Sequence, residues 1–438
     1  MASISYQKTI PIRCETEILI AGGGPSGIAA ALAAAGQGRK VLLLEAQSCL
    51  GGLGTAGLVP GFVTFGDGEN FLSDGIGRLI LDSLSREKGP SYPGSLYSIP
   101  VELLKRVYDR LLLQAGVEFI FQTQVVDVIL CGDRIDMAVC QAKSGFFAVK
   151  ADQFIDCTGD GDVSVWAGAP FEKGDASGNA MPGTLCSLWA GVNFDGRDPN
   201  IDFMSVLKKS FADGVFTVPD HHHSGMTRVG KTLSGGNFGH AFGVDGTDER
   251  SITKFLIEGR ARMPEFERFY REYVPGYENL ELVGTGSLMG IRESRRIQGD
   301  YVLNVEDFKR RAVFPDEIGR YCYPVDIHPA KPTADAYAAF EEEFRRNLRY
   351  QKGESYGIPY RCLIPRNVSN LLVAGRCISC DQKMQASIRV MPGCCITGQA
   401  AGMAAALCCE GKINPRAVKV GDLQQRLKKI GAWLPNAH

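Results

Sequence analysis

The stretch from Glu17 to Thr55 constrains the fold more strongly than any other part of the chain. It begins with a short apolar run and continues through the glycine turn Gly22-Gly23-Gly24-Pro25-Ser26-Gly27 into an alanine-rich segment that reaches Ala35. A second apolar run, Val41 to Leu44, ends at the acidic Glu45. A strand, a glycine turn, a helix, a strand and an acid within about 30 residues are typical of a dinucleotide-binding unit.

Each part of this pattern has a physical purpose. Gly22 permits the tight turn, Gly24 lets the backbone approach a pyrophosphate, and Gly27 lets the helix pack closely on the strand. The positive end of the helix faces the phosphate charge, and Glu45 can accept hydrogen bonds from ribose hydroxyls. The same glycines, together with Pro25, interrupt the apolar segment, which excludes a membrane span of about 20 apolar residues.

The composition is that of a globular protein with room for two domains. The 438 residues are 45% hydrophobic and 22% charged, and their formal net charge is -1. No overall charge therefore favours nucleic acid or an anionic membrane. Fourteen cysteines, and a segment Met1 to Ile12 without a basic start or an apolar signal region, predict reduced thiols and a cytoplasmic location.

Four later stretches repeat the combination of an apolar strand or helix with a glycine-rich turn. They are SCLGGLGT (48–55), ADQFIDCTGDGDV (151–163), NLLVAGRCIS (370–379) and RVMPGCCITGQAAGMAAALCC (389–409). The first follows Glu45 almost directly, as expected if a long dinucleotide continues past the first pyrophosphate contact. Elements from both ends of the chain are thus predicted to form one site.

These motifs resemble the FAD-dependent oxidoreductases of the glutathione-reductase-like flavoprotein superfamily. More narrowly, they are similar to a family distantly allied to the fumarate reductase and succinate dehydrogenase flavoproteins. The resemblance rests on stretches spread over nearly the whole chain, namely GGGPSGIAAALAAA, LLLEAQSCLGGLGTAG, FIDCTGDGDV, LMGIRESRRIQGDYVL, YPVDIH, IPYRCLIP, LLVAGRCIS and RVMPGCCITGQAAG. It implies FAD as the cofactor.

The resemblance also implies which residues hold FAD. It assigns the pyrophosphate, the adenosine, the ribityl chain and the flavin ring to Gly22, Gly24, Pro25, Ser26, Gly27, Glu45, Ala46, Gly51, Gly52, Thr55, Gly57, Val125 or Val126, Cys157, Thr158, Gly159, Asp160, Gly375 and Arg376. A loop from Gly393 to Gln399, which includes Thr397 and Gly398, would open the last helix. The positive end of that helix would face the flavin pyrimidine, where reduction places negative charge.

The expected fold class is α/β. A Rossmann-like FAD-binding domain, with helices on a parallel sheet and an antiparallel insert, would comprise residues 1–170 and 355–438. Between them, residues 171–354 would form an α+β substrate or cap domain. Leu103 to Gln114 is predicted to be a helix, and the strands between Glu118 and Lys150 to form the insert.

The candidate catalytic residues lie in two short motifs. Fumarate-reductase-like sites clamp carboxylates with arginine, and GIRESRRIQGDY offers Arg292 and Arg296, which share a face whether the segment is helix or strand. Alternatively, these arginines and Glu293 form a structural ion network. In YPVDIH, His328 is a candidate general base or else a structural histidine. The His-Thr substrate signature of fumarate reductases is missing, so a dicarboxylate substrate is not implied.

Other features are weaker. Arg361 and Arg389 flank flavin segments and are further candidates for contact with substrate or flavin, His240 is a lesser one, and Cys49 is a remote candidate for covalent flavin attachment. The glycine-rich stretch 282–290 is followed by charges rather than a packed helix, so a second nucleotide site is rejected.

Two further motifs are interpreted as structural. His221 to His223 are assigned to a solvated loop rather than a metal site, and no metal site is predicted elsewhere. The pair Cys377 and Cys380 in C-x-x-C spacing is interpreted as buried small residues rather than a redox pair.

The predicted function is a hydride transfer between a small organic substrate and flavin N5 in an FAD-dependent dehydrogenase or oxidase. Two alternatives stay open. One is a flavin-dependent reductase of an unsaturated substrate, fed by a separate electron donor, and the other is a flavin-binding subunit without turnover. A homo-oligomer and a separate electron donor or acceptor are compatible with the sequence, whereas no nucleic-acid or membrane partner is expected.

Overall fold

The structure, a computed structural model, describes residues 4–221 and 223–437. Its largest sheet confirms the predicted α/β class, since a parallel set of strands continues into an antiparallel meander. The parallel strands stand in the order β3-β2-β1-β6-β17, and β6 also pairs antiparallel with β5, which pairs with β4. Their bounds are β1 (Ile12–Ala21), β2 (Val41–Leu44), β3 (Glu118–Ile120), β4 (Gln124–Cys131), β5 (Arg134–Ala142), β6 (Gly145–Asp156) and β17 (Leu371–Val373).

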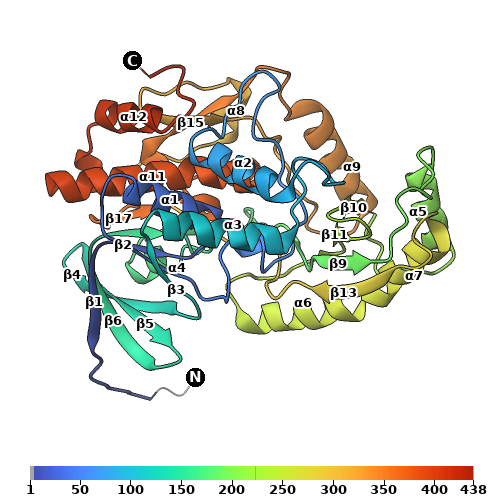
Figure 1. Ribbon diagram of the computed structural model, residues 1–438, viewed down its shortest axis with the longest axis horizontal. Coiled ribbons are helices and arrows are strands. Elements are labelled where there is room, and N and C mark those ends of the chain that lie inside the picture. The colour runs from blue at the N-terminus through green and yellow to red at the C-terminus, as the bar shows by residue number, and fades with distance from the viewer. Residues whose placement is uncertain (1–3, 222, 438) are drawn as a thin grey trace.

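Strand β6 belongs to both parts of this sheet. Its first half, as far as Lys150, pairs with β5, and its second half pairs with β17 from Phe154 to Asp156. The predicted insert is therefore a meander that feeds directly into the centre of the parallel sheet. Figure 1 shows this meander at one end of the long axis of the molecule.

Two helices from opposite ends of the chain pack against each other over the sheet. They are α1 (Pro25–Ala35) and α11 (Met391–Gly411), which lie side by side in Figure 1. The residues of α11 that face α1 are small, and a Cβ on Gly402 would lie 2.1 Å from the carbonyl oxygen of Ala30. Among the described residues, α11 is the one helix long and apolar enough to cross a bilayer, but 89% of its apolar window is buried inside the protein. That burial is what a core helix shows.

The remaining helices of this lobe lie around the sheet and its extensions. They are α2 (Ile76–Lys88), α3 (Val101–Gln114), α4 (Asp162–Trp166), α8 (Val305–Lys309), α9 (Ala334–Glu342), α10 (Gln382–Ile388) and α12 (Val420–Lys429). Two small antiparallel ladders join distant segments, namely β7 (Phe171–Lys173) with β14 (Arg295–Ile297), and β15 (Glu317–Tyr321) with β16 (Tyr356–Pro359).

A second lobe has its own hydrophobic core. Its sheet has the order β10-β11-β9-β13, with β9 (Ser187–Ala190), β10 (His223–Arg228), β11 (Ser234–Phe238) and β13 (Glu281–Thr285), and a short ladder joins β8 (Gly183–Thr184) to β12 (His240–Ala241). The helices are α5 (Phe203–Ala212), α6 (Glu249–Ala261) and α7 (Met263–Tyr273). Trp189, Phe266 and Phe269 are buried at its centre.

The two hydrophobic cores divide the chain differently from the boundaries expected from the sequence. The second core draws its residues from Leu185 to Ile291, whereas Ile297, Phe308 and Tyr321 pack into the first core with the largest sheet. We therefore use the term cap lobe for the second core and its elements, residues 183–291.

Candidate FAD and substrate site

A cleft of about 330 Å³ lies between the first lobe, which contains the parallel sheet, and the cap lobe. The first lobe contributes the glycine turn before α1, the end of β2 and the turn after β6. The cap lobe contributes Ile252 and Leu256 of α6 and the segment from Ser287 to Met289. The predicted cofactor residues that line the cleft are Gly22, Gly24, Pro25, Ser26, Glu45, Ala46, Gly52, Val125, Cys157, Thr158, Gly159, Asp160 and Arg376.

The three motif glycines have three different surroundings. Gly22 has a φ of 97°, and a Cβ there would lie 2.4 Å from the carbonyl oxygen of Cys157. A Cβ on Gly27 would lie 1.9 Å from the carbonyl oxygen of Gly22, so this glycine permits close packing of helix on strand. A Cβ on Gly24 would meet no protein atom within 4 Å, and Gly24 lines the cleft at the N-terminus of α1. The space beside Gly24 is therefore available to a ligand.

Glu45 lies at the far side of the turn with its carboxylate held in place. Its Oε2 accepts a hydrogen bond from the backbone N–H of Gly23 and its Oε1 one from that of Gln47, both at 2.7 Å. Burial raises the pKa of Glu45, although these backbone N–H groups oppose the rise. Each oxygen retains acceptor capacity for a hydroxyl group from the cleft.

The turn after β6 is organised by a buried carboxylate that the sequence analysis did not identify. Asp156 is fully buried and accepts hydrogen bonds from Thr158 and Ser164, each through both its backbone N–H and its hydroxyl. This places the cleft residues Cys157 to Asp160 against the glycine turn. Arg376 then connects the lobes, because its guanidinium donates to Asp160 at 2.8 Å and to the Ile291 carbonyl at 2.6 Å.

Residues 17–427 match the family model described as FAD dependent oxidoreductase. The chain belongs to this family. Its cofactor is FAD, and the cleft fits that group, because the open space at Gly24, the N-terminus of α1 and the carboxylate of Glu45 meet the needs of a pyrophosphate and a ribose. The closer kinship with fumarate reductase and succinate dehydrogenase flavoproteins stays a prediction.

Several solved structures are distantly similar to this FAD-dependent oxidoreductase. A geranylgeranyl bacteriochlorophyll reductase-like protein from Thermoplasma acidophilum is 14% identical with a TM-score of 0.48, covering 95% of this chain and 82% of that one. The flavin-dependent brominase Bmp2 is 14% identical with a TM-score of 0.47, covering 95% and 83%. The p-nitrophenol 4-monooxygenase PnpA from Pseudomonas putida is 12% identical with a TM-score of 0.44, covering 95% and 84%. The family assignment rests on the family model alone.

The remaining predicted cofactor residues lie outside the lining of the cleft. They are Gly27, Gly51, Thr55, Gly57, Val126, Gly375, Gly393, Thr397, Gly398 and Gln399, none of which is among the residues lining the cleft. Thr397 accepts a hydrogen bond from the Gly375 N–H, and Gln399 accepts one from the Ile76 N–H. A Cβ on Gly398 would lie 2.2 Å from the carbonyl oxygen of Ser26. Gly398 thus packs directly against a residue that lines the cleft, and Thr397 fixes Gly375 next to the lining residue Arg376.

The expected loop from Gly393 to Gln399 is helical. Helix α11 already begins at Met391 with Pro392 in its first turn, and it continues to Gly411, before the true last helix, α12. Its glycines serve helix packing and do not form a loop. The residues that reach the cleft from this region are Arg389, Met391 and Cys394.

Arg292 and Arg296 have different partners. The half-buried Arg292 donates to the Pro182 carbonyl at 2.9 Å and to the Thr184 hydroxyl at 2.8 Å, and desolvation with the nearby charge of Arg389 lowers its pKa to about 10. Arg296 pairs with Glu293 at 2.7 Å and donates to the Gly174 carbonyl at 2.9 Å. The expected shared face is therefore not found. The Arg296 contacts are those of a structural ion network.

His328 lies in a buried group with Arg389. Its Nε2 faces Asp326 Oδ2 at 3.3 Å and its Nδ1 faces His240 Nε2 at 2.9 Å, so both ring nitrogens have partners inside the protein. Asp326 also accepts a hydrogen bond from Arg389 Nη2 at 3.3 Å. The residue of this group that lines the cleft is Arg389, which the sequence analysis proposed only as a secondary candidate.

Three other sequence motifs, the C-x-x-C pair, the histidine run and the glycine-rich stretch 282–290, have different places in the structure. Cys377 and Cys380 are buried free thiols, in keeping with the interpretation as small buried residues. His223 begins β10 and stacks on Phe238 at 4.6 Å, so the prediction of a solvated loop is wrong for it, while His222 lies outside the described residues. The glycine-rich stretch 282–290 supplies Ser287, Leu288 and Met289 to the wall of the same cleft.

Proposed function

We propose that this FAD-dependent oxidoreductase oxidises a small organic molecule that binds between the two lobes. The observation that carries the proposal is that one cleft joins the nucleotide motifs to cap-lobe residues beside Arg389. A substrate at that end would be enclosed by apolar side chains of Ile252, Leu256 and Met289, which exclude water from the reaction. Bound FAD supplies a two-electron acceptor.

Arg389 is the residue best placed to orient the substrate. Its Nη2 is held by Asp326, and its Nε is buried without a hydrogen-bond partner among the described residues. A guanidinium that is fixed on one side and unsatisfied on the other favours an oxygen-bearing ligand, such as a carboxylate or a carbonyl group. Arg292, behind it, adds positive charge that strengthens the preference for an anionic substrate group.

The proposal assigns His328 an indirect role. Because both of its ring nitrogens are engaged, it acts on the substrate through Asp326 rather than by direct contact. We therefore treat His328 as a positioning residue and Arg296 as structural. This leaves Arg389, with Arg292 behind it, as the substrate-binding group.

The test is anaerobic flavin reduction by compounds of defined chemistry. The purified holoprotein is mixed with a panel of 2-hydroxy acids, amino acids and primary alcohols, and the visible flavin absorption is followed. Bleaching by one class, with a slower rate in Arg389→Met at unchanged FAD content, is the expected result. No bleaching by any oxidisable compound, together with reoxidation of the dithionite-reduced protein by an enoic acid, would instead favour the reductase alternative.

A third outcome would reject both the oxidation and the reductase alternative. If bound FAD is neither reduced by the panel nor reoxidised by an enoic acid, the proposal of substrate turnover at this cleft is wrong. The flavin-binding subunit would then be the best remaining reading. An absorption spectrum before and after acid precipitation accompanies the test, since flavin that stays with the pellet would indicate covalent attachment and direct attention to Cys49.

A further inference from the structure

Four buried side chains form a continuous chain of hydrogen-bonding contacts beside the cleft. Asp220 Oδ1 lies 3.1 Å from His240 Nδ1, His240 Nε2 lies 2.9 Å from His328 Nδ1, and His328 Nε2 lies 3.3 Å from Asp326 Oδ2. All four residues are less than 10% exposed. We call Asp220, His240, His328 and Asp326 the Asp–His–His–Asp chain.

The chain is one proton short when both imidazole rings are neutral. Three contacts need three protons on ring nitrogens, because an ionised carboxylate only accepts hydrogen bonds. Two neutral imidazoles carry two protons, so one contact always brings two acceptors together. The vacancy can lie at the Asp326 end, between the two rings or at the Asp220 end, and each step along the chain changes the tautomer of one ring.

The surroundings keep the carboxylates ionised and the rings neutral. Burial alone would raise the pKa of both aspartates. However, His240 and Tyr337 hydrogen-bond Asp220, His328 and Arg389 contact Asp326, and these contacts lower both pKa values. Burial lowers the pKa of His240 and, together with the charge of Arg292, that of His328.

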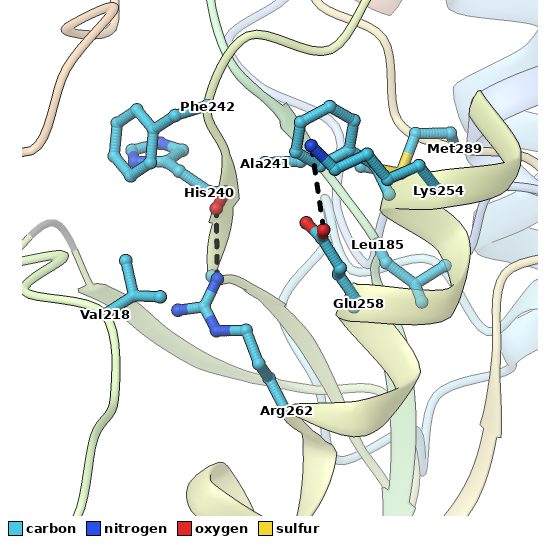
Figure 2. Close-up of a pocket in the computed structure, with 12 residues that line it drawn as sticks. Leu185, Val218, His240, Ala241, Phe242, Lys254, Glu258, Arg262 and Met289 are labelled. Carbon is cyan, nitrogen blue, oxygen red and sulfur yellow. Dashed lines mark hydrogen bonds and ion pairs between the residues drawn. The ribbon is translucent and has the colours of Figure 1, made fainter. Parts of the chain in front are cut away.

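The chain lies between the FAD cleft and a second cavity in the cap lobe. At one end Asp326 holds Arg389, which lines the FAD cleft, and Asp326 also accepts a hydrogen bond from Tyr323 at 3.2 Å. Towards the other end, His240 lines a second cavity of about 300 Å³ in the cap lobe. Figure 2 shows His240 beside Phe242 in that cavity, with Arg262 donating to the His240 carbonyl and with Lys254 and Glu258 on the opposite wall.

We propose that the Asp–His–His–Asp chain takes up one proton from the substrate side of the cleft and holds it between the two rings. Uptake of that proton completes all three contacts, with the charge shared by the two rings. Release restores the vacancy. The geometry thus makes two histidines and two aspartates one acid–base unit.

This inference rests on the proposed function for its role in the reaction. When an alcohol or amine is oxidised, the C–H bond breaks and its electron pair leaves as hydride, for which bound FAD is the acceptor. The O–H or N–H bond breaks too, a C=O or C=N bond forms, and one proton is left for a protein base. A substrate group paired with Arg389 would lie one side chain away from Asp326.

Histidine ring titration by NMR tests the chain without any substrate. In holoprotein with 15N-labelled histidine rings, His240 and His328 are expected to be neutral at neutral pH and to take up one proton with a shared midpoint as the pH falls. In Asp326→Asn, the new amide N–H can donate to His328 Nε2 and fill the vacancy. The shared midpoint should then fall by at least about one pH unit, a tenfold loss of proton affinity.

Asp220→Asn and Tyr337→Phe complete the design. Asp220→Asn supplies the same extra donor at the opposite end, so it should depress the titration of both rings equally, and it serves as the second variant if Asp326→Asn does not fold. Tyr337→Phe removes a donor to Asp220 at 2.7 Å but leaves the proton count unchanged, so the shared titration should persist. Separate midpoints for the two rings, or an effect confined to the ring next to each substitution, would overturn the proposal.

The outcome separates this inference from the proposed function. Shared titration without flavin reduction by any compound would leave the acid–base unit intact and reject the oxidation. Flavin reduction with independently titrating rings would reject the unit alone. If both hold, Asp326→Asn should slow flavin reduction by about 10²- to 10⁴-fold, the range of a general base, while FAD content stays unchanged.

Discussion

At the scale of single residues, the glycines of the turn before α1 differ in what a side chain would meet. Gly24 has a φ of -69°, which any residue adopts, and its Cβ would point into open space at the cleft. Gly24→Val should therefore leave the apoprotein folded, with an unchanged thermal midpoint, but abolish FAD retention. The ratio of FAD to protein after gel filtration and the melting curve of the apoprotein measure the two effects separately.

Gly27→Ala is the matched control for that prediction. Its new Cβ would lie 1.9 Å from the carbonyl oxygen of Gly22, so the helix must move away from the strand. Overpacking of this kind costs about 1–3 kcal/mol of unfolding free energy. Retention of FAD by Gly24→Val, or destabilisation equal to that of Gly27→Ala, would show that the pyrophosphate position is misplaced.

The two arginines of the 290–301 motif should respond differently to substitution. Arg296→Met leaves the buried carboxylate of Glu293 without its cation, which costs about 3–5 kcal/mol of unfolding free energy. Arg292→Met leaves no such carboxylate, since no ion pair of Arg292 occurs among the described residues, and its loss should affect substrate-dependent flavin reduction more than stability. Chemical denaturation curves measure the difference, and adding Glu293→Gln to Arg296→Met should restore part of the loss.

At the scale of elements, local sequence patterns were sufficient to predict the strands and helix of the nucleotide unit. They were not sufficient to predict where α11, the helix packed against that unit, begins. The order strand, glycine turn, helix, strand and acid is encoded in neighbouring residues, so β1, α1 and β2 could be predicted from sequence. The start of α11 could not, because Gly393 and Gly398 look like loop residues until Ile388 is seen packed against the first and Ser26 of α1 against the second. A glycine that serves close packing and one that serves a turn have the same local signature.

The contact between α1 and α11 gives an element-scale prediction. Gly402→Ala would place a Cβ 2.1 Å from the Ala30 carbonyl oxygen and force the two helices apart, at a cost of about 1–3 kcal/mol. Gly421→Ala, on the exposed face of α12 with no atom within 4 Å of its Cβ, should instead stabilise by about 0.5–1 kcal/mol. Denaturant unfolding of both variants tests this, and a Gly402→Ala protein as stable as the parent would contradict it.

At the scale of the whole molecule, the site depends on contacts between residues that are far apart in the sequence, which no local sequence pattern predicts. His240 and His328 are 88 residues apart in the chain, and Asp220 is 20 residues from His240. Each histidine alone is as consistent with a structural role as with catalysis. Their connection, and the exposure of Arg389 to the cleft, arise only from the docking of the cap lobe on the FAD-binding lobe.

That docking predicts how FAD binding should spread through the protein. Because Ile252, Leu256 and the segment from Ser287 to Met289 line the same cleft as the glycine turn, FAD should slow amide hydrogen exchange in both lobes. Exchange in α12, which supplies no residue to the cleft wall, should change little and serves as the internal control. The comparison is made between apoprotein and the same protein reconstituted with FAD, followed by mass spectrometry. Protection confined to the glycine turn, Glu45 and the turn after β6 would show that the cap lobe does not close on the cofactor, and would remove the physical basis for a substrate site between the lobes.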